Sequence, residues 1–321
     1  MEKCVFAGLD NGGKTTIIYT LNKKFSLRSG VRPTIGINRK EATDIKLLGM
    51  KIAYWDLGGQ EKFRQRYFKQ KFNIFAKAEL LFYVIDILDT ERYDESLDYL
   101  EKILNSYSEE LKEFPKVYVL FHKADPDKRH DPVLLENIHN LQDKIDAMSQ
   151  KFHLDYFKTT IHDEKTVIHA FSAGVLFVSK KGQMINNLLR EYAKATFSSA
   201  VLLVDDNGLM LGEHHNKKNR IYLEVCRTVA PRVTLTMERL REYRVTTENV
   251  ALNVKFENNG MGEKDAEGIV FIRDFCIDET TVVYVISLAR NERTMSLSWK
   301  YIPELASKLQ NLMNSFTIEK T

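Results

Sequence analysis

Along roughly the first 180 residues, short apolar runs alternate with longer stretches in which apolar side chains recur every three or four positions. The short runs are rich in β-branched and aromatic residues and predict buried strands, whereas the longer stretches predict amphipathic helices. Strands that alternate with helices form βαβ crossovers. This part of the chain is therefore predicted to be an α/β domain with a mostly parallel sheet and helices on both faces.

The predicted elements follow from these runs. We expect strands at residues 3–7, 43–48, 51–55, 80–85, 116–121 and 154–159. We expect helices at residues 14–24, 62–75, 91–111, 132–151 and 165–178. The strands at 43–48 and 51–55 are joined at Gly49-Met50 and are expected to form a hairpin.

The pattern changes near residue 180. A helical period covers residues 180–197, and two short apolar runs flank Asn207-Gly208, a dipeptide typical of hairpin turns because both residues tolerate positive φ. We then expect a helix at 219–243 that Pro231 bends or interrupts. Strands at 250–256, 268–277 and 281–288 and a helix at 302–316 complete the chain. This order predicts an α+β domain with an antiparallel sheet.

A chain of 321 residues is long enough for two domains, because single cores rarely grow much beyond about 250 residues. We place the boundary near Lys180–Gly182 and predict domains at residues 1–180 and 183–321. The hydrophobic fraction of 44% and the charged fraction of 28% are typical of a soluble globular protein.

Charge and cysteine content narrow the functional classes. The net charge is only +3, so no strong field favours nucleic acid or bare lipid. Cys4, Cys226 and Cys276 are widely spaced and match no metal motif, which favours a reducing compartment. The chain has no recognisable secretory signal, apolar run of about 20 residues or lipidation motif. We therefore expect a cytoplasmic protein whose membrane attachment, if any, runs through a partner.

The segment GLDNGGKTT, residues 8–16, lies between a predicted strand and a predicted helix and fits the phosphate-loop pattern Gly-x4-Gly-Lys-Thr. Backbone N–H groups at such a helix start converge on phosphate oxygens. Lys14 would reach the β- and γ-phosphates, and the Thr15 hydroxyl would bind Mg²⁺. The residues expected to hold the nucleotide here are Gly8, Asp10, Asn11, Gly12, Gly13, Lys14, Thr15 and Thr16. The alternative is a glycine-rich turn that contains Lys-Thr by chance.

Two further segments fit hydrolysis of a nucleoside triphosphate. In YWDLGGQEKF, Asp56 would hold the Mg²⁺ hydration shell, Gly59 would present its N–H to the γ-phosphate, and Gln60 would orient the attacking water. In VRPTIGIN, the Thr34 hydroxyl would complete the Mg²⁺ ligands, with Thr15 and Asp56, while a γ-phosphate holds the loop. Arg32 is a candidate arginine finger in cis, but a solvated loop arginine is favoured.

The segment HKAD, residues 122–125, follows a predicted buried strand and is close to a guanine-recognition loop. Asp125 would accept from the ring N–H and exocyclic amine of guanine, whereas adenine would leave this carboxylate unpaired. The Lys123 stem would lie along the base. His122 replaces the usual Asn and could donate to N7 of the base with one ring nitrogen only. Backbone N–H groups at Thr160 and Ile161 would contact the guanine oxygen.

Taken together, these motifs resemble the Ras-like small GTPases. GLDNGGKTT, PTIG and WDLGGQEKFRQRYF are similar to the Arf family over about the first quarter of the chain. HKAD, NIFAKAELLFYVIDI and FKTTIHDEKTVIHAFS resemble the Rag/Gtr family, which also has His in the guanine loop and carries a C-terminal roadblock domain. From about Gln183 the element order and the segment REYAKATFSSAVLLVDDNG are similar to that domain, so the Rag/Gtr resemblance covers nearly the whole chain.

This resemblance implies a Ras-like G domain followed by a roadblock-like dimerisation domain with an antiparallel sheet. It implies a regulatory GTPase that binds GTP or GDP with Mg²⁺, hydrolyses GTP slowly, and pairs with a second roadblock-containing GTPase or with a copy of itself. Exchange proteins, activating proteins and a scaffold at a membrane are the implied partners. Asp10 would crowd Gln60 and the attacking water, so slow intrinsic turnover is expected.

Three alternatives remain open from the sequence. The chain could be an Arf-like trafficking GTPase with an appended roadblock domain, although Glu2 stands where acylation requires glycine. It could be a nucleotide-stabilised scaffold in which the C-terminal half is the working part. A P-loop kinase or ATPase is the third, disfavoured by the spacing of Asp56 and Gly59 and by Asp125.

Overall fold

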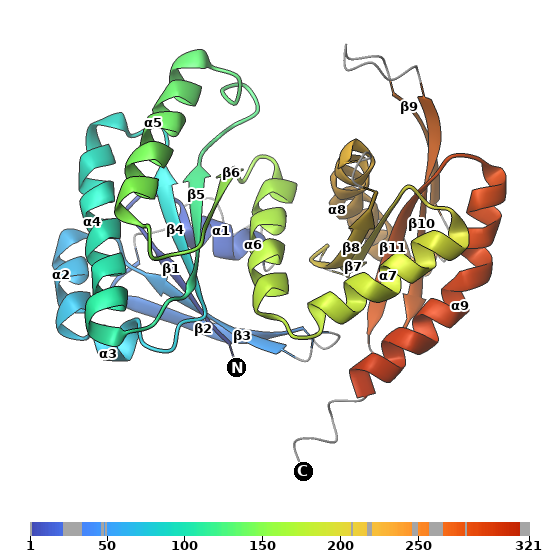
Figure 1. Cartoon of the computed structure of the whole chain (residues 1–321), viewed down its shortest axis with the longest axis horizontal. Coiled ribbons are helices and arrows are strands. Elements are labelled where there is room, and N and C mark those ends of the chain that lie inside the picture. Colours follow the sequence, from blue (N-terminus) through green and yellow to red (C-terminus); the bar gives the residue numbers. More distant parts are fainter. Residues whose placement is uncertain are drawn as a thin grey trace. The chain divides into compact units, whose positions relative to one another are not determined.

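The computed structural model describes residues 2–21, 34–45, 48, 50–206, 208–216, 220–245, 250–256, 266–279 and 281–314. Two compact units are present, one made of residues 1–44 and 50–174 and the other of residues 45–49 and 175–321 (Figure 1). The division falls within helix α6 (Glu164–Val178), a few residues before the boundary expected from the sequence. Each unit has its own sheet.

The first unit is built on a six-stranded sheet with the order β2-β3-β1-β4-β5-β6. Its strands are β1 (Glu2–Ala7), β2 (Ile37–Ile45), β3 (Met50–Leu57), β4 (Leu80–Asp86), β5 (Lys116–His122) and β6 (Leu154–Thr159). β1 pairs in parallel with both β3 and β4, and β4–β5 and β5–β6 are also parallel. The predicted mostly parallel sheet is confirmed, and it brings the carboxyl ends of β1, β3, β4 and β5 to one edge.

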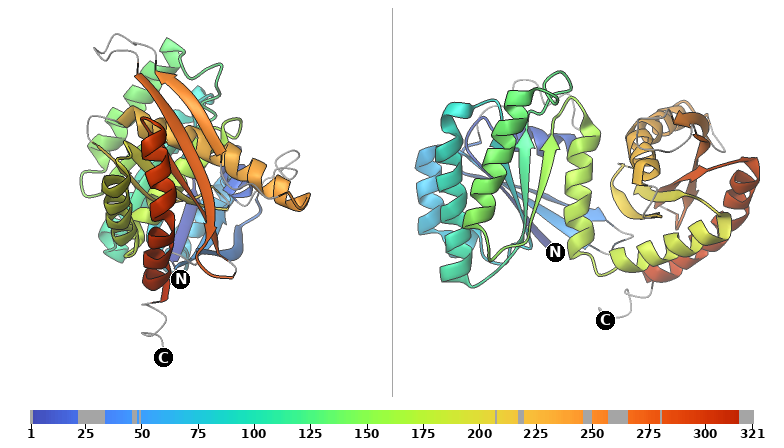
Figure 2. Two further views of the ribbon diagram at one scale, coloured as in Figure 1. Left: turned by 90° about the vertical axis from the view of Figure 1, so that its right-hand side faces the viewer. Right: turned by 45° about the horizontal axis from the view of Figure 1, so that its top comes forward.

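Helices cover both faces of this sheet (Figure 2). The helices are α1 (Lys14–Leu21), α2 (Glu61–Lys69), α3 (Lys71–Ile74), α4 (Tyr93–Asn105), α5 (Pro132–Met148) and α6. On one face, Val5 and Ala7 of β1 share a core with Leu100 of α4 and Leu141 of α5. On the other face, Phe6 stacks on Phe82, whose ring lies 5.7 Å from that of Phe171 in α6. Alternate residues of the same strand therefore pack into the apolar cores on opposite faces of the sheet. Because both faces are buried, the strands read as unbroken apolar runs in the sequence.

Several predicted boundaries in this unit were wrong. The helix predicted at 62–75 is divided at Gln70 into α2 and α3, and the apolar period does not change there. By contrast, the bounds of the helix predicted at 91–111 are confirmed to within one residue, although it begins with a 3₁₀ turn (Thr90–Arg92) and ends in a π-helical turn (Ser106–Leu111). β2 begins at Ile37 instead of residue 43. It is an edge strand, and the polar residues in its first half gave that stretch the composition of a loop. Residues 22–24, Arg32 and Gly49 lie outside the described residues.

The second unit contains a five-stranded sheet with the order β8-β7-β11-β10-β9. Its strands are β7 (Ala200–Asp205), β8 (Met210–His215), β9 (Val250–Phe256), β10 (Ala266–Cys276) and β11 (Val282–Ala289). Each neighbouring pair is antiparallel, so the predicted antiparallel sheet is confirmed. Helix α8 (Arg220–Glu242) packs on one face, where Cys226 and Met237 meet Ile272. Helices α7 (Gly182–Thr196) and α9 (Glu292–Asn314) cover the other face, where Phe271 contacts Trp299 (Figure 2).

Three local predictions in this unit can be compared with the structure. Helix α8 continues through Pro231 without interruption, because its apolar face is packed on the sheet on both sides of the proline. Helix α9 begins at Glu292, ten residues earlier than predicted, because the Asn291 side chain accepts from Thr294 N–H and caps the first turn. Asn207 lies outside the described residues, but Gly208 has a φ of 78° in the β7–β8 connection.

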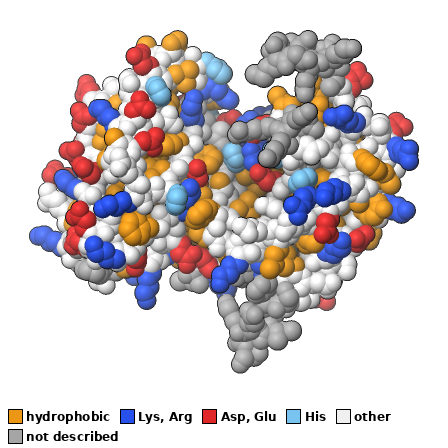
Figure 3. All heavy atoms as spheres, in the orientation of Figure 1, with side chains coloured by type: hydrophobic (Ala, Val, Ile, Leu, Met, Phe, Trp, Pro, Cys, Tyr) orange, Lys and Arg blue, Asp and Glu red, His pale blue; other side chains and the backbone are white. Residues whose placement is uncertain are grey.

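The described part of the chain contains no helix that is long and apolar enough to span a bilayer. On the face drawn in Figure 3, basic and acidic side chains are interspersed and do not separate by sign. This distribution agrees with the small net charge of +3.

Candidate functional site

The residues that the sequence singled out for phosphate binding lie around one cavity of about 170 Å³ in the first unit. The phosphate loop, residues 8–16, joins the end of β1 to the start of α1, between the ends of β3 and β4 in the sheet. The cavity is lined by Asp10, Asn11, Gly13, Lys14, Thr15, Thr16, Thr34, Leu57, Gly58, Gly59 and Gln60. Three separate sequence motifs are thus brought to one place.

Lys14 is buried at the base of the cavity. Its ammonium donates to the carbonyl oxygens of Gly8 at 3.0 Å and Leu9 at 2.6 Å. Burial lowers the pKa of Lys14 to about 8, although the neighbouring Asp56 acts in the opposite direction. A bound phosphate would offer this ammonium full negative charges in place of two carbonyl dipoles, so the site favours an anion.

Three side-chain oxygens meet beside Lys14. Thr15 Oγ1 donates to Asp56 Oδ2 at 2.6 Å, Thr34 Oγ1 donates to the same oxygen at 3.1 Å, and the two hydroxyls are 2.9 Å apart. Asp56 is fully buried, and its other oxygen, Oδ1, has no hydrogen-bond partner. An orphaned carboxylate oxygen next to two hydroxyls fits a hard cation such as Mg²⁺. Among the described residues no three His, Cys, Asp or Glu side chains cluster as metal ligands, so phosphate oxygens and water would complete the shell.

Gly59 and Gln60 lie directly against the phosphate loop. A β-carbon at Gly59 would lie 2.1 Å from the Asp10 nitrogen and 2.1 Å from the Leu9 carbonyl carbon, so only glycine fits this approach. Gln60 precedes α2 in an extended conformation, and its side chain caps nothing while lining the cavity. The Gln60 carbonyl accepts from the N–H of Phe63 and Arg64. The side chain of Gln60 is therefore free to meet a reactant in the cavity.

His122 is buried between two elements of the site. Its Nδ1 lies 2.9 Å from Thr159 Oγ1, and its ring packs against Gly13, where a β-carbon would be 2.4 Å from His122 Cδ2. Gly13 has a φ of 90°, a second reason for glycine at this position. Burial lowers the pKa of His122 to about 4, so the imidazole is neutral. The contact of His122 with the phosphate loop was not foreseen from the sequence.

The remaining base-loop residues gather at the ends of β5 and β6. Lys123 has a φ of 67°, and its ammonium pairs with Asp86. Asp125 accepts a hydrogen bond from the Thr160 hydroxyl. The Thr160 N–H, expected to face guanine, donates to Thr166 Oγ1 at 3.0 Å, and Ile161 follows directly. The Thr160 N–H is thus paired within the chain, contrary to its expected role toward guanine, and the Thr160 hydroxyl lies beside Asp125.

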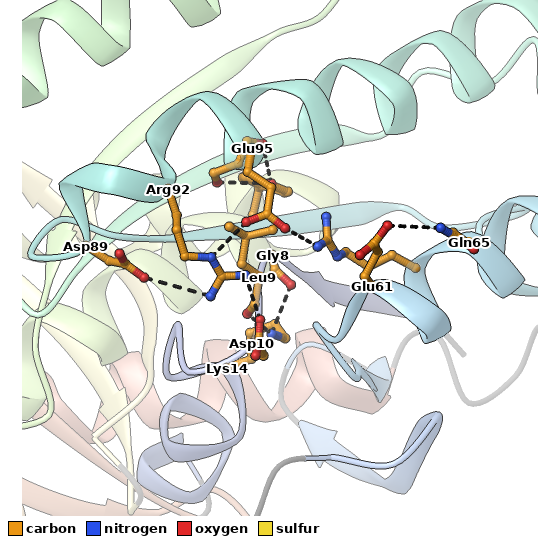
Figure 4. A network of polar contacts seen from close by, with 12 residues as sticks. Gly8, Leu9, Asp10, Lys14, Glu61, Gln65, Asp89, Arg92 and Glu95 are labelled. Atoms are coloured by element: carbon orange, nitrogen blue, oxygen red, sulfur yellow. Dashed lines mark hydrogen bonds and ion pairs between the residues drawn. The ribbon is translucent and has the colours of Figure 1, made fainter.

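A polar network beside the cavity was missed from the sequence (Figure 4). Arg92, at the end of the 3₁₀ turn, donates to Asp10 Oδ1 at 2.8 Å and to Glu95 Oε2 at 2.7 Å. Glu95 in turn accepts from Arg64 of α2. The available signal was positional and concerned only Arg92 and Glu95, which follow β4, because β4 pairs with β1 and must end near the phosphate loop.

Comparison with known proteins agrees with these features. Residues 3–229 match the family model described as the Gtr1/RagA G protein conserved region. Ras-related GTP-binding protein B of Rattus norvegicus is 27% identical over 184 residues, which is 56% of this chain and 47% of that protein. Ras-related GTP-binding protein A of Dictyostelium discoideum is 26% identical over 221 residues, 68% of this chain and 71% of that protein. This chain therefore spans about half the length of the rat relative.

Among solved structures, the Arl6 BBS3 small GTPase of Trypanosoma brucei with bound nucleotide analogue GppNp aligns with a TM-score of 0.45 and 20% identity. That alignment covers 56% of this chain and 98% of the trypanosome chain.

Proposed function

The chain belongs to the Gtr1/RagA family of G proteins, and on this premise we propose that it is a regulatory GTPase that binds GTP and GDP with Mg²⁺ and hydrolyses GTP slowly. The observation that carries the proposal is the buried Asp56 carboxylate, which holds the Thr15 and Thr34 hydroxyls and keeps one oxygen unpartnered next to Lys14. Such a group of oxygens is costly to bury unless a cation and phosphates complete it.

In this proposal six residues at or beside the cavity have defined tasks. Lys14 exchanges the Gly8 and Leu9 carbonyls for phosphate oxygens, and Thr15, Thr34 and Asp56 hold the cation. Mg²⁺, when bound, neutralises charge that develops on the β- and γ-phosphate oxygens. Gly59 presents its backbone N–H at the γ-phosphate end, and Gln60 orients the attacking water.

The switching element would be the pair of segments Thr34–Gly36 and Gly58–Gln60. Gly58 N–H donates to the Gly36 carbonyl at 2.9 Å, and the Tyr67 hydroxyl of α2 donates to the same carbonyl at 2.7 Å. A change at Thr34 is therefore passed to α2 through Gly36. Because a γ-phosphate would hold both Thr34 and Gly59, its loss would release both segments together and alter the surface offered to partners.

Base selection in this proposal belongs to Asp125. Its carboxylate is satisfied here by the Thr160 hydroxyl, and guanine would supply two N–H donors to it. Adenine supplies neither donor at the matching positions and would leave a charged acceptor unpaired.

We further propose that the second unit is a roadblock-like dimerisation domain. Its sheet ends in edge strands β8 and β9, whose outer backbone groups could pair with another chain. Large apolar side chains are also exposed on this unit, among them Phe197 and Tyr243. The partner would be a copy of this chain or a related GTPase, and attachment to a membrane would run through a scaffold. Light scattering of the full chain at micromolar concentration should give the mass of a dimer with itself or with a co-expressed partner, whereas a monomer in both cases would contradict the proposal.

The proposed nucleotide specificity is tested by competition. The purified chain is loaded with a fluorescent GDP analogue, and unlabelled GTP, GDP, ATP or ADP is added with Mg²⁺. GTP and GDP should displace the analogue at stoichiometric excess, whereas ATP should not displace it at a hundredfold higher concentration. Equal displacement by ATP would support the P-loop kinase or ATPase alternative instead.

A further inference from the structure

Four charged side chains form a continuous relay from the phosphate loop to α2 (Figure 4). Arg92 Nη2 donates to Asp10 Oδ1 at 2.8 Å, and Arg92 Nε donates to Glu95 Oε2 at 2.7 Å. The other Glu95 oxygen, Oε1, accepts from Arg64. Glu95 therefore joins two arginines with two different oxygens. We refer to Asp10, Arg92, Glu95 and Arg64 as the Glu95 relay.

The relay ends one turn from Gln60. Arg64 lies in the first turn of α2, and its backbone N–H donates to the Gln60 carbonyl at 3.0 Å. On the other side of Gln60, Gly59 packs directly on the backbone of Leu9 and Asp10. The segment that carries Gln60 is thus tied to the phosphate loop twice, once through Gly59 and once through the relay. These two connections close a ring of contacts around the position of Gln60.

Most ion pairs on a protein surface contribute little to the free energy of folding, but one member of this relay, Arg64, is buried. The Arg64 side chain is only 11% exposed, and its Nε has no hydrogen-bond partner, so Glu95 is its neutralising contact. The Arg64 guanidinium also lies 5.2 Å from the centre of the Tyr99 ring in α4. Removal of the Glu95 charge would leave a buried cation unneutralised, and Arg64 would have to move toward solvent. That movement would shift the first turn of α2.

The electrostatics of the relay favour its charged form. Hydrogen bonds from Arg92, followed by those from Arg64, hold the pKa of Glu95 below its usual range even though burial acts against them. Burial acts to raise the pKa of Asp10, but the hydrogen bond and charge of Arg92, a backbone hydrogen bond and the charge of Lys14 together lower that pKa. Asp10 therefore meets the γ-phosphate end of the cavity as half of an ion pair and not as a bare carboxylate.

We propose that Glu95 is a positioning residue for GTP hydrolysis, because it holds Arg64, and through Arg64 the first turn of α2, at a fixed place relative to the phosphate loop. This inference rests on the proposed function. Glu95 does not line the phosphate cavity, and its side chain contacts Arg64 and Arg92. Its effect is therefore expected on the chemical step and not on the binding of GDP.

The test is single-turnover hydrolysis of GTP by the full chain with Mg²⁺, measured alongside GDP affinity and thermal unfolding. Glu95→Gln keeps the shape of the side chain and removes its charge. It should slow hydrolysis by about ten- to a hundredfold, the effect expected when a reacting group is displaced by about an ångström. GDP affinity should stay within about twofold of the wild-type value, the change expected when a mutated side chain makes no contact with the ligand.

Two further variants make the test specific. Arg64→Met breaks the relay without leaving a buried charge. It should slow hydrolysis to a similar degree, and it keeps the test valid if Glu95→Gln does not fold. The double variant should be no slower than either single variant, because both break the same connection. Asp98→Asn is the matched control: this exposed carboxylate lies one turn further along α4 and lines the same groove as Glu95. It should hydrolyse GTP at the wild-type rate.

The outcomes separate this inference from the proposed function. If the wild-type chain hydrolyses GTP and both relay variants match its rate, the inference is wrong while the function stands. Additive slowing in the double variant, or a loss of GDP affinity equal to the loss of rate, would also contradict a positioning role. If the wild-type chain hydrolyses no GTP, the proposed function fails and the inference falls with it.

Discussion

The imidazole of His122 lies against the backbone of Gly13, so that the first residue of the base loop supports the phosphate loop. A β-carbon at Gly13 would be 2.4 Å from His122 Cδ2 and 2.7 Å from Nε2. On its other side, His122 Nδ1 lies 2.9 Å from Thr159 Oγ1 at the end of β6. Both ring nitrogens therefore face protein groups, and the ring links β5, β6 and the phosphate loop.

This placement predicts that His122 contributes little to recognition of guanine N7. The analogue 7-deaza-GTP lacks that acceptor, and it should bind to the chain within about twofold of GTP, since no buried polar group is left unpaired by the change. Competition against a fluorescent GDP analogue measures this ratio. A loss of more than tenfold for the deaza analogue would show that an imidazole N–H donates to N7.

The pH dependence of stability provides an independent check on His122. Its pKa is lowered by burial from 6.5 to about 4, so between these values the unfolded chain binds a proton that the folded chain excludes. The free energy of unfolding should therefore fall as pH decreases from 6.5 toward 4, and the stabilisation from the neutral imidazole should be complete above 6.5. The decrease amounts to about 3 kcal/mol at most.

Urea unfolding at several pH values, compared between the wild-type chain and His122→Gln, isolates this contribution from that of other groups. The variant should show a shallower dependence between pH 6.5 and 4, since Gln does not titrate. Parallel curves for the two proteins would mean that the imidazole is not buried in the neutral form.

Asp125 should determine which base is bound. Asp125→Asn replaces one acceptor with a donor, so guanine should lose affinity by about a hundredfold or more. Xanthine has a carbonyl where guanine has its amine, and XTP should bind to the variant better than GTP does. His122→Asn serves as the comparison and should keep the preference for guanine. If the two variants changed base preference equally, the division of tasks within this loop would be wrong.

Thr34 should distinguish GTP from GDP. Its hydroxyl lies 3.1 Å from Asp56 Oδ2 and 2.9 Å from Thr15 Oγ1, and in the proposed function a γ-phosphate holds the Thr34 segment at the cation site. Thr34→Ala should weaken binding of a non-hydrolysable GTP analogue by about five- to tenfold, the cost of one charge-assisted contact. GDP affinity should not change, and titration calorimetry in Mg²⁺ compares the two. An equal loss for both nucleotides would place Thr34 outside the switching element.

The strand ends explain why much of the site could be predicted from the sequence. Lys14, Asp56 and His122 each follow an apolar run, and parallel pairing of β1 with β3 and β4 brings such positions to one edge. Close backbone approaches also determine residue type, as at Gly13 and Gly59, where glycine is present because a side chain cannot fit. Motif order and strand position together were therefore sufficient to place these residues.

The Glu95 relay could not be predicted in the same way. Arg92, Glu95 and Arg64 are charged residues near helix starts, a context in which most side chains are solvated. Their pairing depends on the distance between α2 and α4, which the apolar period of either helix does not specify. The early start of α9 at Glu292 was missed for a related reason, since the Asn291 cap is a single side chain.

The central claim, that this cavity hydrolyses GTP, is tested most directly by phosphate release from GTP in a single turnover of the purified chain with Mg²⁺. We predict a slow intrinsic rate, on the order of 10⁻⁴ to 10⁻² s⁻¹. Gln60→Leu should reduce that rate by at least about tenfold, because Gln60 orients the attacking water, while GTP affinity is retained. Release of phosphate from ATP at the same rate, or a rate that Gln60→Leu leaves unchanged, would contradict the account.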